Sequence, residues 1–141
     1  MNLSKSTKWT KVNNYATAAT SAIESTVIDM LGYDGVLFVT TIAVANAGNH
    51  IKVQSGTDGA VSDAADLTGT KVICTSANEC VGVDVYRPLE RYLRAYVTRT
   101  ASSACGEIYA IQYCGSKLPI DNTTAGTLNI ELHVSPAEGT A

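Results

Sequence analysis

The chain has 141 residues, of which 45% are hydrophobic and only 16% charged, and its formal net charge is -3. This length suits one domain with a single core. The acidic balance argues against nucleic acid as a partner, because phosphate binding requires an extended positive surface. The longest apolar stretch, Gly35–Ala47, is too short to cross a bilayer, so no membrane partner is expected. Residues 1–14 contain no apolar segment of a secretory signal, which predicts synthesis in the cytoplasm.

The first 22 residues show no sustained period of 2 or 3.6. We therefore predict an extended N-terminal arm over residues 1–22 and a single β-sandwich domain over residues 23–141. A frayed terminus with incidental aromatic residues is the alternative interpretation of the arm. The candidate contact residues of the arm are its basic and aromatic side chains, namely Lys5, Lys8, Trp9, Lys11 and Tyr15.

The rest of the chain predicts about eight short strands separated by turns. The run Gly35–Ala45 is β-branched and apolar on both faces, which is typical of a strand buried on both sides. Several later segments alternate with period 2, and each predicts a strand with one buried face. These segments are residues 80–87, 91–100, 106–114 and 127–134, the first of which we expect to form a hairpin with residues 70–75.

No amphipathic helix longer than a turn or two is visible, and turn signals recur every 8–15 residues. This spacing favours an all-β fold, an antiparallel β-sandwich of jelly-roll type with an extended N-terminal arm. The long connections and the polar N-terminal segment suit a sandwich better than a closed up-and-down barrel.

Residues with metal-binding or redox chemistry are few. The spacing of the four cysteines and the distant positions of His50 and His133 match no zinc site, so we expect reduced thiols. The one disulfide that we weigh as an alternative joins Cys74 to Cys80. Three aspartates in residues 55–67 (Asp58, Asp63 and Asp66) match no calcium-loop pattern and favour a solvated acidic loop.

Motifs of catalysis are missing from the sequence. It contains no G-x-S-x-G elbow, no phosphate-binding glycine loop and no H-E-x-x-H helix. We therefore predict that the protein is not an enzyme, that it needs no cofactor, and that it has no catalytic or metal-binding residues.

The most unusual feature of the sequence is a cluster of arginine and tyrosine. All four arginines of the chain fall within residues 87–99. Tyr and Arg are enriched at the energetic centres of protein interfaces, so we expect a subunit interface here. An ordinary Tyr-rich outer sheet face is the alternative. The candidate interface residues are Tyr86, Arg87, Arg91, Tyr92, Arg94 and Tyr96.

Several short motifs occur along the chain, namely Gly32-Tyr33-Asp34-Gly35, Gln54-Ser55 with Asp58-Gly59, Leu67-Thr68-Gly69-Thr70, Val83 to Pro88 followed by Arg91 to Arg94, and the closing residues 136–141. In this succession the sequence resembles small proteins of tailed bacteriophages that look like capsid decoration, or cement, proteins. The resemblance implies a jelly-roll trimer on the outer capsid surface of the virion, made in the host cytoplasm. It also implies that the arm contacts the major capsid protein and that the Tyr/Arg strand lies at the trimer contact.

Two other functions remain open at this point. A carbohydrate- or receptor-binding module of a phage tail or fibre would use exposed Tyr and Trp side chains to stack on sugars. A cupin-like, metal-dependent enzyme would need converging histidines and carboxylates, and the chain has only two histidines.

Overall fold

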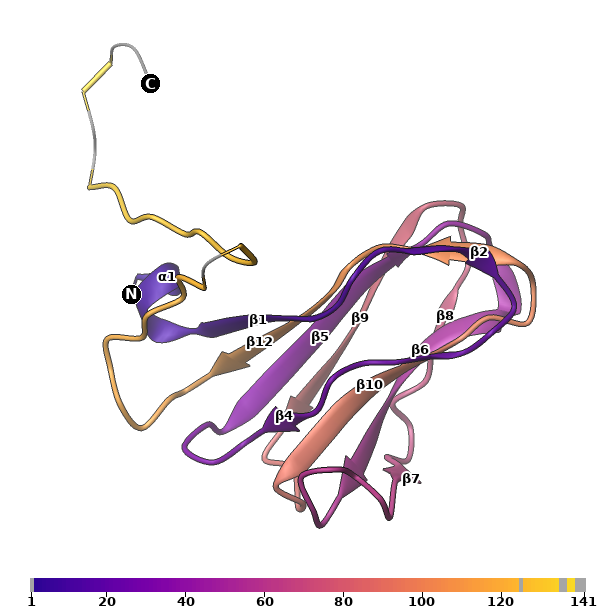
Figure 1. Cartoon of the computed structure of the whole chain (residues 1–141), viewed down its shortest axis with the longest axis horizontal. Coiled ribbons are helices and arrows are strands. Elements are labelled where there is room, and N and C mark those ends of the chain that lie inside the picture. Colours follow the sequence, from indigo (N-terminus) through magenta and orange to yellow (C-terminus); the bar gives the residue numbers. More distant parts are fainter. Residues whose placement is uncertain (1, 125, 135–136, 139–141) are drawn as a thin grey trace.

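Two antiparallel β-sheets pack face to face in the computed structural model, which describes residues 2–124, 126–134 and 137–138 (Figure 1). The predicted all-β fold class is confirmed, and within these residues the one helix is the single turn α1 (Leu3–Ser6). The strands are β1 (Lys8–Asn13), β2 (Ala16–Ala19), β3 (Ile23–Glu24), β4 (Ile28–Asp29), β5 (Gly35–Ile42), β6 (Asn46–Gly56), β7 (Ala65–Asp66), β8 (Val72–Cys74), β9 (Glu79–Tyr86), β10 (Tyr92–Thr98), β11 (Ser103–Cys105) and β12 (Ile108–Tyr113).

Short strands follow one another in line, so that each sheet has four rows of backbone. In sheet A, β1 and β2 run along β12 and β11, which run along β5, and β9 closes the other edge. In sheet B, β3 and β4 run along β10, which pairs with β6, and β7 and β8 pair with the far edge of β6. Every one of these pairings is antiparallel.

The core lies between the sheets and follows from the alternation of side chains along each strand. Phe38 of β5, Ile51 of β6 and Leu93 of β10 are fully buried there. The opposite side of β5 differs from the sequence prediction, because Leu37 and Val39 face outward and are only partly buried. The run from Gly35 is therefore covered on one side only within the described chain.

The N-terminal segment corrects the predicted arm. Residues 8–13 and 16–19 are not extended away from the domain but form the edge row of sheet A, where Trp9 pairs with Ile111 and Ala16 with Cys105. Pairing with β12 satisfies the backbone groups of β1, and Val12 is buried in the core. This strand was not predicted because the small polar residues around Trp9 give the segment no sustained period of 2.

The C-terminal segment also differs from its prediction. Residues 127–134 are not a strand of the sandwich, and their one backbone pairing is an isolated bridge between Thr124 and Leu128. Figure 1 shows this segment extending away from both sheets. Of the closing stretch 136–141, Ala137 and Glu138 are among the described residues, and both are exposed.

The predicted hairpin between residues 70–75 and 80–87 is wrong. β8 pairs with β6 in sheet B, whereas β9 pairs with β5 in sheet A. The turn between them therefore carries the chain from one sheet to the other, and turn residues alone do not distinguish this crossing from a hairpin.

Asn122 fastens the C-terminal segment to the N-terminal one. Its buried amide donates hydrogen bonds of 2.8 Å to the carbonyls of Ser4 and Thr7, and its oxygen accepts one of 2.8 Å from the Trp9 amide. The Lys8 ammonium donates to the Asp121 carbonyl nearby. The chain is thus tied to α1 and β1 immediately before it leaves the sandwich.

Candidate binding surfaces

The outer face of sheet A carries three rows of side chains that cross its strands. Residues opposite one another in an antiparallel pair point to the same face, so the strand registers give the rows directly. The first row holds Tyr113, Gly35 and Tyr86, the second Trp9, Ile111, Leu37 and Asp84, and the third Lys11, Tyr109, Val39 and Gly82. Most of this surface is apolar, and no described segment covers it fully.

An apolar groove of about 640 Å³ lies over the first two rows. Its floor is formed by strand residues including Leu37 and Ile111, and one wall by α1 and the chain after β12. The lining residues are Leu3, Ser6, Thr7, Trp9, Leu37, Asp84, Ile111, Tyr113, Cys114 and Leu118. Binding sites are commonly apolar hollows with a few polar groups, and this groove has that composition.

Tyr113 is held rigidly in the floor of the groove. Its ring lies over Gly35, where even a methyl group would collide with it, and is parallel to the ring of Tyr86 at 6.5 Å between centroids. Its hydroxyl donates a 2.7 Å hydrogen bond to the Asp84 carboxylate. Burial and the Asp84 charge raise the pKa of Tyr113 above its usual range. The phenol therefore stays neutral and the floor keeps its shape.

The predicted contact residues of the N-terminal segment lie in α1, in β1 and in the connection after β1. Trp9 lines it, and Lys11 lies on the same outer face one row further along β1. Lys5 belongs to α1, and Tyr15 is exposed between β1 and β2. These residues thus belong to the edge of sheet A, and their contact with a capsid stays a prediction.

The outer face of sheet B is polar and its charged groups have partners. Arg94 of β10 donates to Gln54 at 2.8 Å and to Glu24 at 2.8 Å. Lys52 of β6 contacts Asp66 at 2.5 Å and lies 4.8 Å from the centre of the Tyr96 ring. This face is largely satisfied by the chain itself.

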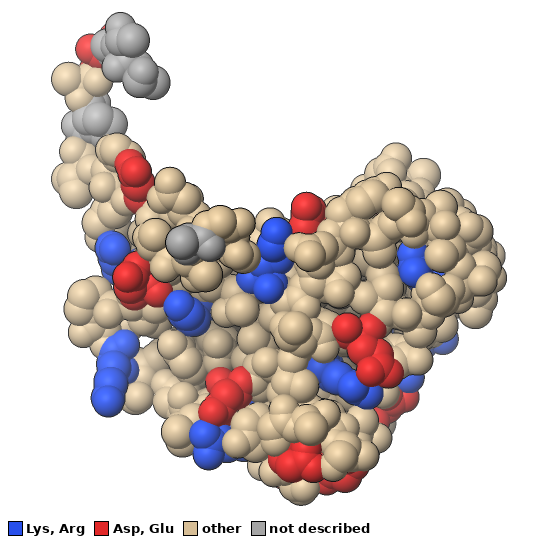
Figure 2. Space-filling view, viewed as in Figure 1, with Lys and Arg blue, Asp and Glu red and all other residues tan. Residues whose placement is uncertain are grey.

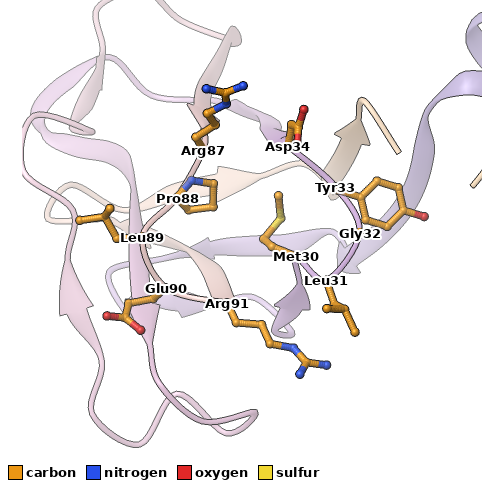
Figure 3. A pocket seen from close by; sticks show the side chains of 10 residues that line it. All are labelled: Met30, Leu31, Gly32, Tyr33, Asp34, Arg87, Pro88, Leu89, Glu90 and Arg91. Atoms are coloured by element: carbon orange, nitrogen blue, oxygen red, sulfur yellow. The ribbon is translucent and has the colours of Figure 1, made fainter. Parts of the chain in front are cut away.

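A second hollow, of about 510 Å³, opens at one end of the sandwich between residues 30–34 and 87–91 (Figure 3). Leu31 and Leu89 lie on opposite sides of it, and Leu89 is 99% exposed. Arg87 has a left-handed backbone with φ of 50°, and its guanidinium lies 5.2 Å from the centre of the Tyr86 ring. An exposed apolar rim of this kind is suited to contact with another protein.

Arg91, which lines this second hollow, is held by an ion pair. Its guanidinium donates two hydrogen bonds, of 2.7 and 2.6 Å, to the Asp29 carboxylate. The hydrogen-bonded guanidinium lowers the pKa of Asp29 to about 2. Arg91 is therefore engaged within the chain rather than presented as a free cation.

The predicted interface cluster does not form one surface. β9 and β10 belong to different sheets, so the residues of the cluster do not share one sheet face. Tyr86 and Arg87 lie at the end of sheet A, whereas the β10 residues Tyr92, Arg94 and Tyr96 belong to the outer face of sheet B. A role for any of these residues in subunit contact stays a prediction.

The described residues offer few side chains for metal binding or redox chemistry. They contain no group of three His, Cys, Asp or Glu side chains that could hold a metal ion. Asp58 and Asp63 accept hydrogen bonds from their own loop, and Asp66 binds Lys52. All four cysteines are free, with Cys74 and Cys105 buried.

Within the described part of the chain, no helix has the length and apolar character needed to cross a membrane.

Comparison with known proteins finds similarity among solved structures. No protein-family model and no curated protein sequence matches the chain. Among solved structures, it is similar to the crystal structure of the SPBc2 prophage-derived protein YomS, with a TM-score of 0.46 and 12% sequence identity. The similarity covers 75% of this chain and 93% of that chain. A likeness of this degree assigns neither a family nor a function.

The groove was not predicted from the sequence, and neither was the Asn122 clamp, that is, the hydrogen bonds of Asn122 to Ser4, Thr7 and Trp9. The alternation of Tyr109, Ile111 and Tyr113 did place apolar side chains on one strand face. Only the register of β12 against β1 and β5 brings them beside Trp9 and Leu37. Asn122 gave no signal, because an Asn in a connection normally indicates a turn.

Proposed function

We propose that the protein is a structural protein of a phage virion that binds the outer surface of the head as a trimer and stabilises the capsid. The observation that carries this proposal is the apolar groove on sheet A, which lies at the end of the molecule from which residues 127–134 project. A domain with an adhesive face and a projecting segment is suited to repeated contacts in a lattice, where several weak contacts in one oligomer add up.

The order of the strands supports the jelly-roll interpretation that the resemblance implies. Counting each in-line pair of strands as one gives eight strands, in the order 1-8-3-6 in sheet A and 2-7-4-5 in sheet B. Consecutive strands thus alternate repeatedly between the two sheets, as the two Greek keys of a jelly roll require. Jelly rolls serve in capsid and lectin domains alike, so the fold supports the proposal without deciding it.

The proposal is tested by mixing the purified protein with phage heads that lack decoration and sedimenting them. We expect saturable co-sedimentation in a fixed ratio to the major capsid protein, a rise in the temperature at which heads open, and a trimer by light scattering. A monomer that leaves heads unchanged would contradict the proposal.

Charge reversal tests which edge of the domain contacts the head. We expect the Lys5→Glu/Lys11→Glu variant to bind heads more weakly, because both lysines lie beside the groove. Each single reversal, Lys5→Glu or Lys11→Glu, is compared with the matched control Lys71→Glu, an exposed lysine next to β8 of sheet B. Equal losses in the single variants and the control would indicate a net-charge effect instead of a contact.

A carbohydrate-binding role is the second candidate, and one observation favours it. Trp9 and Tyr113 line the same groove as the Asp84 carboxylate, and aromatic rings beside a hydrogen-bond acceptor are suited to sugars. Saturable binding on a glycan array that is abolished by Trp9→Ala would favour this function over the capsid role.

A further inference from the structure

Residues 127–134 have the pattern of a strand but lack a strand partner among the described residues beyond the bridge at Leu128. Apolar residues at every second position alternate with Asn129, Glu131 and His133. The apolar side chains at the far end are open to solvent, since Leu132 is 40% and Val134 is 84% exposed. Covering the apolar face of such a segment with another surface lowers the free energy, because apolar area is removed from water.

We propose that residues 127–134 of one copy bind in the apolar groove on sheet A of a second copy. This inference deepens the proposed function and rests on the self-association that the function includes. It assigns to the C-terminal segment the joining role that the sequence had suggested for an N-terminal arm.

The spacing of the two surfaces is compatible. Successive rows on the outer face of sheet A lie two residues apart along each strand. The apolar side chains of the segment are also two residues apart, so both surfaces repeat at about 6.6 Å. An extended segment can therefore place successive apolar side chains between successive rows of the groove.

The apolar side of the segment also borders the groove of its own chain. Ile130 and Leu132 line a hollow of about 370 Å³ together with Leu3 and Trp9. The same two residues, Leu3 and Trp9, line the groove on their other side. Beyond this point the segment leads away from the two sheets (Figure 1). Leu37 lines the groove but is not among the residues that line the hollow beside Ile130 and Leu132.

The charges of the two partners are complementary. The segment carries Glu131, whereas Lys11 beside the groove forms no ion pair among the described residues, and Lys5 forms none beyond the influence of its charge on the Asp121 carboxylate. Figure 2 shows basic side chains on the body near the base of the projecting segment and acidic ones along the segment. Opposite charges at the rim of an apolar contact favour encounter and fix its orientation.

Exchange of this kind is head-to-tail, because each copy gives one segment and receives another. A head-to-tail contact closes into a ring when the rotation between copies allows it. A trimer of this construction has three equivalent contacts and no free groove.

Light scattering on paired variants is the first test. We expect Leu132→Asp/Val134→Asp to lower the self-association constant about a hundredfold, because charged groups replace two buried apolar ones. The matched control places the same new side chains on the polar side of the segment, as Asn129→Asp/His133→Asp, and should retain most of the oligomer. A wild-type monomer, or an oligomer unaffected by the first variant, would overturn the proposal.

Disulfide trapping identifies the contact, because the groove already contains the exposed thiol of Cys114. Under mild oxidation the Leu132→Cys variant should give covalent multimers on a non-reducing gel. Adding Cys114→Ser should abolish them, whereas Cys80→Ser, which removes the other exposed thiol, should not. A disulfide within one chain, seen as a faster-migrating monomer, would show that the segment fills its own groove and would overturn the exchange.

Binding to heads separates this inference from the proposed function. A protein that exchanges its segments but ignores heads contradicts the capsid role and leaves the exchange standing. A protein that binds heads as a monomer contradicts the exchange and the trimer, and leaves the contact with the head standing.

Discussion

The two outer faces of the sandwich differ in how far the side chains on them are satisfied by contacts within the chain. On sheet B, Arg94 and Lys52 form hydrogen bonds and ion pairs with side chains of neighbouring strands. On sheet A, the corresponding positions hold Leu37 and Ile111, whose apolar surface has no such partners within the described chain. A face that satisfies its own groups needs no partner, whereas an apolar face over a central strand indicates one.

The largest expected effect comes from removing the clamp beside the apolar face. Asn122→Ala should lower the free energy of unfolding by about 2–3 kcal/mol, because the Trp9 amide and two carbonyls lose their buried partner. Urea denaturation measures this change, and limited proteolysis should release the C-terminal segment. Asn129→Ala, an exposed residue of the same segment, should have almost no effect; equal losses would contradict the clamp.

Next in size is the difference in dye binding between the two faces. In the Leu132→Asp/Val134→Asp background, a fluorescent apolar dye should bind the open groove. Adding Ile111→Lys should weaken its affinity about tenfold, or about 1.4 kcal/mol, because a cation enters the apolar floor. The same change on sheet B, Thr98→Lys, should leave dye binding intact. If dye titration shows the same loss of affinity in both variants, the two faces do not differ in dye binding and the prediction is contradicted.

A smaller effect is expected from the ion pairs of sheet B. Arg94→Ala should cost about 0.5–1 kcal/mol in the free energy of unfolding, since the Glu24 side chain is half exposed and the pair is screened by water. The cost should shrink when salt is added to the denaturation buffer. A loss of more than about 2 kcal/mol would mean that the network of sheet B behaves as a buried one.

The smallest effect is a pH dependence at the end of the sandwich. Arg91 lowers the pKa of Asp29 from 3.8 to about 2, so the folded state binds this proton less readily than the unfolded state. The stability from this pair is present above about pH 4 and is lost as the pH falls toward 2. In the Asp29→Asn variant, the urea concentration at the unfolding midpoint should therefore change less between pH 5 and 2.5 than in the wild type. In the control Glu90→Gln, in the loop between β9 and β10, the midpoint should depend on pH as it does in the wild type.

Strands with one core face and one solvent face were predictable from sequence. The alternation in residues 80–87, 91–100 and 106–114 placed β9, β10 and β12 correctly, because burial on one side imposes period 2. β1 was missed because Trp9 and Lys11 share its outer face, so its polar and apolar residues do not separate cleanly. Which strands pair was not predictable, since β8 and β9 are neighbours in sequence but lie in different sheets.

The segment 127–134 shows the limit of pattern arguments most directly. Its alternation is as regular as that of β10, yet it forms no strand of the sandwich. Alternation reports that one face needs covering, and it does not say which surface provides the cover. The groove could not be foreseen for the same reason, because it depends on the three registers that align four strands.

Asn122 also determines how the molecule would carry mechanical load. A pull on the C-terminal segment would first open the bridge between Thr124 and Leu128. The load would then reach the Asn122 hydrogen bonds and pass from them to α1 and β1. β1 is the outermost row of sheet A and is bonded along one edge to β12. Tension between copies would thus be borne by the rim of one sheet, while the core between the sheets stays unloaded.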